Sequence, residues 1–142
     1  MPTQTIWEPL LSQILAEFKC QTGTLHRTQA DGQTLGLLCQ IGVPEALIPK
    51  ISLIPFGKGI AGAAAEKREA VELCNLQQDL GGIAKPDARQ TKVSGSLAVP
   101  MFDPVSQQVI GTLGIGMIDP HDFSEQEKQR LAEHARQIVA KW

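Results

Sequence analysis

The chain has 142 residues, a formal net charge of −2 at pH 7 and 42% hydrophobic residues. This length and composition are typical of one globular domain, so we expect a single domain over residues 1–142. The basic residues are scattered, and aromatic residues make up only 4% of the chain. A nucleic-acid-binding protein needs a basic face or stacking aromatic side chains, so this class of function is disfavoured.

The composition also bears on the cellular compartment. No stretch approaches the roughly 20 apolar residues that a membrane span needs, and no basic segment precedes an apolar run at the N-terminus. The cysteines Cys20, Cys39 and Cys74 are odd in number and lack metal-ligand spacing. We therefore expect a cytoplasmic protein with reduced thiols and no metal site, which binds neither membrane nor nucleic acid.

The first part of the chain predicts a helix followed by a hairpin. Apolar residues at helical spacing indicate a helix from about Trp7 to Cys20, with Pro9 in its first turn. A strand over 24–28, a turn at Asp31-Gly32 and a strand over 34–41 form the hairpin. The odd positions of the second strand are predicted to share one apolar face. These positions are Leu35, Leu37, Cys39 and Ile41.

The middle of the chain alternates short elements with turns. We expect a short helix or turn over 44–50, a strand over 50–54 and an alanine-rich helix over 59–68. A short strand over 70–73 then leads into a polar insert over 75–92, and an insert of this length in a small domain is typical of a binding loop.

The last part predicts a hairpin and a capped helix. Strands are expected over 93–101 and 108–118, and Ser124 with Glu127 forms a capping box for a helix that ends near Ala140. Consecutive strand-turn-strand units favour antiparallel pairing. The sequence thus predicts an α+β domain with the terminal helices on one face of the sheet and the mid-chain helix and loops on the other.

Five short motifs occur in the order found in GAF domains, and the chain resembles that family over most of its length. The motifs are Pro55-x-Gly57-x-Gly59-Ile60-Ala61-Gly62, the segment 70–73 with Asp79 beyond it, Ser96-x-x-Val99-Pro100, the segment 110–115, and Phe123-Ser124. The resemblance implies a GAF/PAS-like six-stranded antiparallel sheet. It also implies a small-molecule pocket on the face away from the terminal helices.

The last hairpin supports a pocket independently of the resemblance. If the hairpin is centred near Val105, small residues share one face and bulky residues the other. The predicted pairs on the small face are Ser94–Gly116, Ser96–Gly114 and Ala98–Thr112, and those on the bulky face are Leu97–Leu113 and Met101–Val109. The small face leaves room for a ligand or lets the 59–68 helix pack closely, and both interpretations stay open.

Candidate ligand-binding residues follow from this geometry and from the insert above it. They are Phe56, Lys58, Ile83, Arg89, Thr91, Lys92, Ser94, Ser96, Ala98, Thr112 and Gly114. Lys58 at a helix start, together with Arg89 and Lys92, favours an anionic ligand. The alternative is that the glycines beside Lys58 only serve the turn and that the insert is a solvated loop. The sequence identifies neither the ligand nor a cofactor.

Within the GAF family the chain is similar to free methionine-(R)-sulfoxide reductases, which use cysteine thiolates and substrate-binding carboxylates. The cysteine positions are occupied by Ile51, Ala61 and Lys85, and the carboxylate positions by Ser96, Gly114 and Gly116. Because both groups are missing, this reductase activity is not expected. Cys74 beside the insert is the remaining redox candidate, whereas His26, His121 and His134 are expected to be ordinary surface residues.

The leading hypothesis is a non-enzymatic, small-molecule-binding sensory or signalling GAF module, roofed by the 75–92 insert. Apolar stripes on the terminal helices suggest a homodimer, although the stripes could instead cover the sheet. One alternative is a divergent thiol-dependent reductase of the methionine sulfoxide reductase type that uses Cys74, alone or with Cys39. The other alternative is a domain that only binds proteins.

Overall fold

The structure of the protein is a computed structural model that describes residues 3–73, 95–119 and 121–142. Within these residues a six-stranded sheet has the order β3-β2-β1-β6-β5-β4, and all neighbouring strands are antiparallel. The strands are β1 (Thr22–Thr28), β2 (Thr34–Ile41), β3 (Leu53–Pro55), β4 (Val71–Leu73), β5 (Gly95–Phe102) and β6 (Val109–Met117). The helices are α1 (Thr3–Phe18), η1 (Glu45–Leu47), α2 (Ile48–Ile51), α3 (Gly59–Lys67) and α5 (Glu125–Val139).

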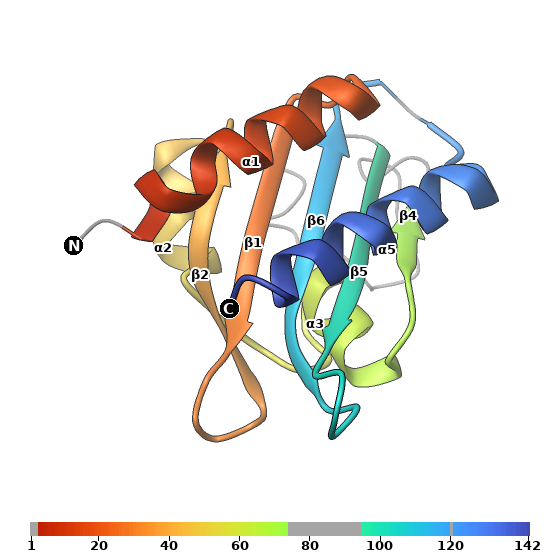
Figure 1. Ribbon diagram of the computed structural model, residues 1–142. Helices are drawn as coiled ribbons and strands as arrows, with labels where there is room; N and C mark the ends of the chain where they lie inside the picture. Colours follow the sequence, from red (N-terminus) through yellow and green to blue (C-terminus); the bar gives the residue numbers. More distant parts are fainter. Residues whose placement is uncertain (1–2, 74–94, 120) are drawn as a thin grey trace.

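The helices cover both faces of the sheet (Figure 1). α1 and α5 lie side by side along one face, and α2 and α3 lie on the opposite face. The α+β architecture predicted from the sequence is therefore confirmed. It places the chain's two terminal helices on the side away from α3.

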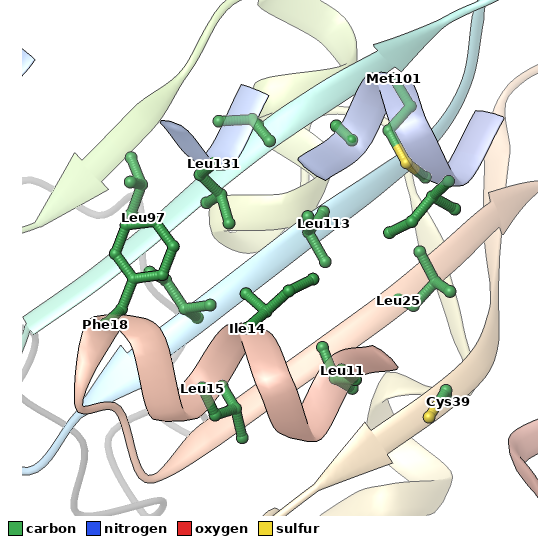
Figure 2. Close-up of a cluster of buried hydrophobic side chains, with 14 of the residues drawn as sticks. Leu11, Ile14, Leu15, Phe18, Leu25, Cys39, Leu97, Met101, Leu113 and Leu131 are labelled. Atoms are coloured by element: carbon green, nitrogen blue, oxygen red, sulfur yellow. The ribbon is translucent and has the colours of Figure 1, made fainter. Parts of the chain in front are cut away.

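The main hydrophobic core lies between the sheet and the terminal helices. Figure 2 shows α1 side chains pointing toward side chains of the sheet, among them Ile14 and Leu113, which are both fully buried. From α5, Leu131 is also fully buried in this cluster. The apolar stripes of the terminal helices thus pack against the sheet within one chain, as the second interpretation of the stripes expected.

A charged cluster joins the two terminal helices at the edge of this core. Arg130 Nε of α5 donates to Glu17 Oε2 of α1 at 2.7 Å, and His134 Nε2 lies 3.0 Å from Glu17 Oε1. The hydrogen bond from Arg130 is the main reason why the pKa of Glu17 is lowered. These partly exposed contacts link α1 to α5 beside the buried core.

The pairing of β5 with β6 differs from the predicted hairpin by two residues. Ser96 lies opposite Gly116 and Ala98 opposite Gly114. The turn is therefore not centred on Val105. Within the turn, Gln107 takes a left-handed conformation with φ of 62°. A shift of two residues keeps each side chain on its expected face, so the small face of the hairpin survives the correction.

β-bulges overturn two further predictions about faces. The register shifts between Met101 and Phe102, and Val109 packs with Leu35 on the α3 side while Met101 stays in the main core. A second shift in the pairing of β1 with β2 puts Leu35 on one side and Cys39 on the other. An extra residue in one strand reverses the alternation beyond it, so the odd positions of β2 do not share one face.

Two element boundaries were also wrong. α1 begins at Thr3, so Pro9 lies inside the helix rather than in its first turn. Lys50 belongs to α2, where Pro49 occupies the first turn, and the following strand is β3. A proline fixes a helical φ in the first turn of a helix, which favours the helical conformation here.

Gly111 of β6 lies in a filled part of the core. A Cβ atom at this position would lie 2.7 Å from Met101 Cε and 2.7 Å from the ring of Trp142, and it would also meet the carbonyl oxygen of His26. By contrast, a Cβ at Gly114 would have Thr24 Oγ1 as its nearest neighbour, at 3.0 Å. The two glycines of one strand thus meet very different surroundings.

We predict that Gly111→Ala lowers the free energy of unfolding by about 1–3 kcal/mol, because overpacking forces core atoms to move. Gly114→Ala should cost less than about 1 kcal/mol, because the Thr24 side chain can rotate away. Urea unfolding of both variants with unchanged m-values measures the difference. Equal losses would show that the two faces of β6 are packed alike, contrary to the structure.

Candidate functional site

A cavity of about 360 Å³ lies on the α3 side of the sheet. Its floor comes from β1, β5 and β6, and its walls come from α2, β3 and the first turn of α3. Most of the wall side chains are apolar; they include Val43, Leu47, Ile51, Ile54 and Ile60. A concave, mainly apolar space with a few polar groups is the usual form of a small-molecule site.

Small side chains on alternate positions of three strands make the floor. Gly114 of β6 lies between Thr24 of β1 and Ala98 of β5, and all three line the cavity. Ser96 of β5 and Thr22 of β1 add to the same floor. Because side chains alternate between faces, the bulky residues next to these positions point into the main core. The space above the floor is therefore a direct consequence of the strand sequence.

The other half of α3 packs closely on the sheet. Ala63 and Ala64 form a buried cluster with Val71 of β4 and Ala98 of β5. Both interpretations of the small residues in the hairpin, close packing of the helix and an open space, thus apply to different parts of the sheet. Under the second half of α3 these residues permit close packing, and beside its first turn they leave the cavity.

The first turn of α3 carries amide groups without acceptors. Its N-cap residue is Lys58, whose side chain accepts no hydrogen bond. None of the described residues accepts a bond from the amides of Gly59, Ile60 or Ala61, and these residues line the cavity. Amides and the helix dipole make such an end attractive to negative charge. α5 differs, because Ser124 caps it with a full capping box.

Among the residues that the structure describes, the charged side chains lining the cavity are basic. Lys50 and Lys58 belong to the lining, and no aspartate or glutamate does so among the residues that the structure describes. Both lysines are exposed to solvent as well. The described polar part of the cavity therefore favours an anion or a neutral molecule over a cation.

His26 of β1 is a buried part of the cavity wall and not the surface residue that was expected. Only 1% of it is exposed, and its Nε2 lies 2.9 Å from the carbonyl oxygen of Ile51 in α2. A carbonyl oxygen only accepts, so Nε2 must carry the proton and Nδ1 of the neutral ring is a bare acceptor. No described group bonds to Nδ1, and burial lowers the pKa of His26.

The structure brings four of the predicted ligand residues together. Lys58, Ser96, Ala98 and Gly114 line the cavity. Phe56 packs instead with Leu35, Ala65 and Val109, and Thr112 is buried beside the floor without lining it. The predicted residues Ile83, Arg89, Thr91, Lys92 and Ser94, and the redox candidate Cys74, lie outside the described residues.

Sequence reasoning missed several lining residues. Thr24 and His26 occupy alternate positions of β1 beside the small residues of β6, and this pairing was not predicted. Alternation along β1 was the signal that could have found them. Lys50 was placed at the boundary between a short helix or turn and a strand, and it was not recognised as a lining residue; it belongs to α2.

The two cysteines within the described residues are poor nucleophiles. Burial, with a smaller effect of the Glu127 carboxylate, raises the pKa of Cys20 to about 12. Burial likewise raises the pKa of Cys39 to about 11, and this thiol belongs to the main core. A thiolate, and not a thiol, is the attacking species in cysteine chemistry. The described cysteines therefore behave as structural residues.

Residues 4–140 match the family profile described as GAF domain, and the chain belongs to this family. A GAF domain is a regulatory fold that binds small molecules or mediates dimerisation in many of its members. A comparison with curated proteins finds no match to the sequence. Within the described residues no helix is long and apolar enough to cross a membrane, and no cluster of side chains could hold a metal ion.

Several solved structures share the fold. The GAF domain of Acinetobacter phosphoenolpyruvate-protein phosphotransferase has a TM-score of 0.77 and 18% identity, over 99% of this chain and 81% of that one. The free methionine-R-sulfoxide reductase of Neisseria meningitidis, solved in complex with its substrate, has a TM-score of 0.77 and 19% identity, over 98% of this chain and 77% of that one. A domain of a putative two-component sensor histidine kinase from Sinorhizobium meliloti has a TM-score of 0.75 and 15% identity, over 96% of this chain and 88% of that one. At these identities the likeness shows the fold alone.

We predict that His26 makes stability depend on pH. The unfolded chain takes up a proton at its histidine near pH 6.5, whereas native His26 resists protonation until a lower pH. The unfolded state thus binds more protons in this range, so stability is present above about pH 6.5 and falls as the pH drops. Thermal unfolding from about pH 8 to pH 5 measures the effect.

His26→Gln is the matched variant, because its amide can still donate to Ile51. Its melting temperature should fall less between pH 7 and pH 5 than that of the unmodified protein. Glu17 and Glu127 have lowered pKa values and titrate below this window, so they do not obscure the comparison. Parallel curves for the two proteins would show that His26 titrates as it does in the unfolded chain.

Proposed function

We propose that the protein is a non-enzymatic, cytoplasmic GAF module that binds a small anionic molecule in the cavity and signals its presence. The observation that carries this proposal is the first turn of α3, where three amides and Lys58 border the cavity without a described acceptor. The resemblance to GAF domains supports small-molecule binding on this face of the sheet. The proposed ligand has a mainly apolar body and one negatively charged group.

The polarity of the cavity supports this choice of ligand. A carboxylate or phosphate at the first turn of α3 would accept bonds from the free amides and complete the cap that Lys58 does not provide. The apolar body would then lie on the floor around Ala98 and Gly114. Burying that body supplies affinity, and the charged group supplies orientation.

The floor offers a physical route from the cavity to the terminal helices. Leu97 and Ile115 border the cavity, and their side chains belong to the core that packs against α1 and α5. A ligand that moves β5 or β6 therefore changes the surface on which both helices rest. A homodimer, if these helices form one, must use their outward faces, because the apolar stripes are buried within the chain.

Three probes with one apolar body and different charges test the anion preference. Phenylpropionate should bind more tightly than phenylpropanol, and phenylpropylamine should bind most weakly. Two-dimensional amide NMR should show the largest shifts at Gly59, Ile60 and Ala61 for phenylpropionate. Equal affinity for the acid and the amine, or shifts confined to the other face of the sheet, would contradict the proposal.

Variants at the two ends of α3 separate a local charge effect from a general one. We predict that Lys58→Gln weakens phenylpropionate binding by about threefold to tenfold, because one charged partner is lost. Lys67→Gln removes the same charge from the last turn of the helix, outside the cavity lining, and should change affinity less than about twofold.

A larger residue on the floor tests where the probe binds. Gly114→Val should abolish binding of phenylpropionate and phenylpropanol alike, because its side chain occupies the space above the floor. Ser106→Val, on the exposed turn between β5 and β6, is the control for a general effect of valine. Unchanged binding by Gly114→Val would place the ligand elsewhere.

The alternative function, a thiol-dependent reductase of the methionine sulfoxide reductase type, would depend on Cys74. Its support is the shared fold of the Neisseria enzyme and two further reductases of that kind. The raised pKa values of Cys20 and Cys39 weaken it, because neither thiol is readily ionised. Reduction of free methionine sulfoxide by the unmodified protein, lost in Cys74→Ser, would establish the enzyme and displace the binding module.

A further inference from the structure

His26 is the buried ionisable group of the cavity, and its hydrogen bonds are only half complete. Its Nε2 donates to the carbonyl oxygen of Ile51 at 2.9 Å and so ties the floor strand β1 to the α2 wall. Its Nδ1 is inaccessible and has no partner among the described residues. A buried polar atom without a partner calls for an explanation, such as an ordered water, an ion or a functional role.

A possible second partner lies directly across the sheet. Thr112 of β6 pairs with His26 of β1, and its hydroxyl is also buried and unbonded among the described residues. A hydroxyl can donate to a neutral Nδ1 or accept from a protonated one. A rotation of the Thr112 side chain could thus serve His26 in either protonation state. The imidazolium form would then have an oxygen acceptor at each nitrogen.

Among the described residues that line the cavity, no acidic side chain offers His26 a countercharge. Of the elements around the cavity, α2 offers Lys50 and the turn before α3 offers Lys58, both basic. The described residues of β5 and β6 contain no ionisable group, and the acidic residues of η1 and α3, Glu45 and Glu66, do not line the cavity. Arg27, the next residue on β1, stacks on Trp142, a residue of the opposite side's core.

We propose that the cavity binds its anionic ligand together with a proton, which is held on Nδ1 of His26. This inference rests on the proposed function, because it requires that the ligand carry the negative charge. A neutral His26 suits the protein without a ligand, because burial disfavours the charged imidazolium and lowers the pKa of this residue. An anion in the same cavity supplies the missing countercharge, so the ligand and the proton favour each other's binding.

The coupling has a definite size and sign. Where binding raises proton uptake by one, the dissociation constant falls tenfold for each unit by which the pH is lowered. This slope holds only between the pKa of His26 in the protein without a ligand and its pKa in the protein with the ligand bound. A ligand without charge gains nothing from the proton. The pH dependence of affinity therefore reports the charge of the ligand as well as the state of His26.

Two fluorescent probes with the same aromatic body make the test sharp. Anilinonaphthalene sulfonate keeps its negative charge across the whole range from about pH 5.5 to pH 7.5, and N-phenylnaphthylamine lacks the sulfonate. We expect the sulfonate to bind several-fold more tightly at the lower pH, up to about tenfold per unit, and the neutral probe to change less than about twofold. Displacement by phenylpropionate and loss of binding in Gly114→Val place the probes in the cavity.

Calorimetry counts the protons without any variant. Titration of the sulfonate at about pH 6.5 in two buffers of different ionisation enthalpy gives the number taken up per ligand, and we expect a value between zero and one that is clearly positive. No uptake at any pH in this range overturns the inference and leaves the proposed function intact. Failure of the sulfonate to bind at any pH overturns both.

Variants assign the proton to its residue. His26→Gln keeps a donor for Ile51 but cannot bind a proton, so its affinity for the sulfonate should not vary with pH. Thr112→Val removes the acceptor for Nδ1 and should shift the pH dependence to lower pH. His121→Gln is the control, because His121 bonds to Glu127 at the start of α5, outside the cavity lining. An unchanged slope in His26→Gln contradicts the proposal.

A general loosening of the protein in acid would expose apolar surface and bind both probes. The neutral probe would then gain affinity in parallel with the sulfonate, and His26→Gln would show the same gain. Either result overturns the inference. Near-ultraviolet circular dichroism at both ends of the pH range confirms that tertiary packing is retained during the comparison.

Discussion

The alternation of side chains along β6 is the constraint on which the rest of the structure depends. This strand lies at the centre of the sheet, between β1 and β5. Leu113 and Ile115 point into the core beneath α1 and α5, while Gly114 between them faces the cavity. A strand can do this only because neighbouring side chains leave it on opposite sides. Core and cavity are therefore two consequences of one short sequence, and neither can be redesigned without the other.

Much of the fold could be predicted because it follows from local patterns. The order of the elements, the small floor of the hairpin and the sides taken by the terminal helices all follow from periodicity and turn residues. The bulge in β2 could not be predicted, because the apolar run from Leu37 to Cys39 hides the change of alternation that the extra residue causes. The burial of His26 could not be predicted either, because the sequence around it alternates polar and apolar residues like a half-exposed strand. The residue is buried by tertiary contacts, among them the one with Ile51 of α2.

The two helices that flank the sheet meet different demands at their N-termini. Ser124 and Glu127 satisfy the first amides of α5, and this helix serves only to cover the core. Lys58 occupies the same position of α3, and its side chain accepts no hydrogen bond from these amides. Relative to a good cap, this lowers the free energy of unfolding by about 0.5–2 kcal/mol. The two glycines that flank Lys58, with φ of 89° at Gly57 and 64° at Gly59, permit the sharp entry but add no acceptor. Stability alone does not explain this choice, whereas an acceptor that arrives with a ligand does.

The sheet thus separates what stabilises the protein from what gives the cavity its polarity. On one side, tightly packed apolar side chains and the Glu17–Arg130 contact hold the terminal helices. On the other side, the described residues that border the cavity include two lysines, three amides without a described acceptor and a histidine with one bonded nitrogen. The elements of this wall are short, since α2 has four residues and β3 has three. Any response to a ligand must cross the sheet through the strands that border both regions. Leu97 and Ile115 are at that boundary, where a small shift of the backbone on the cavity side becomes a change of packing beneath α1 and α5.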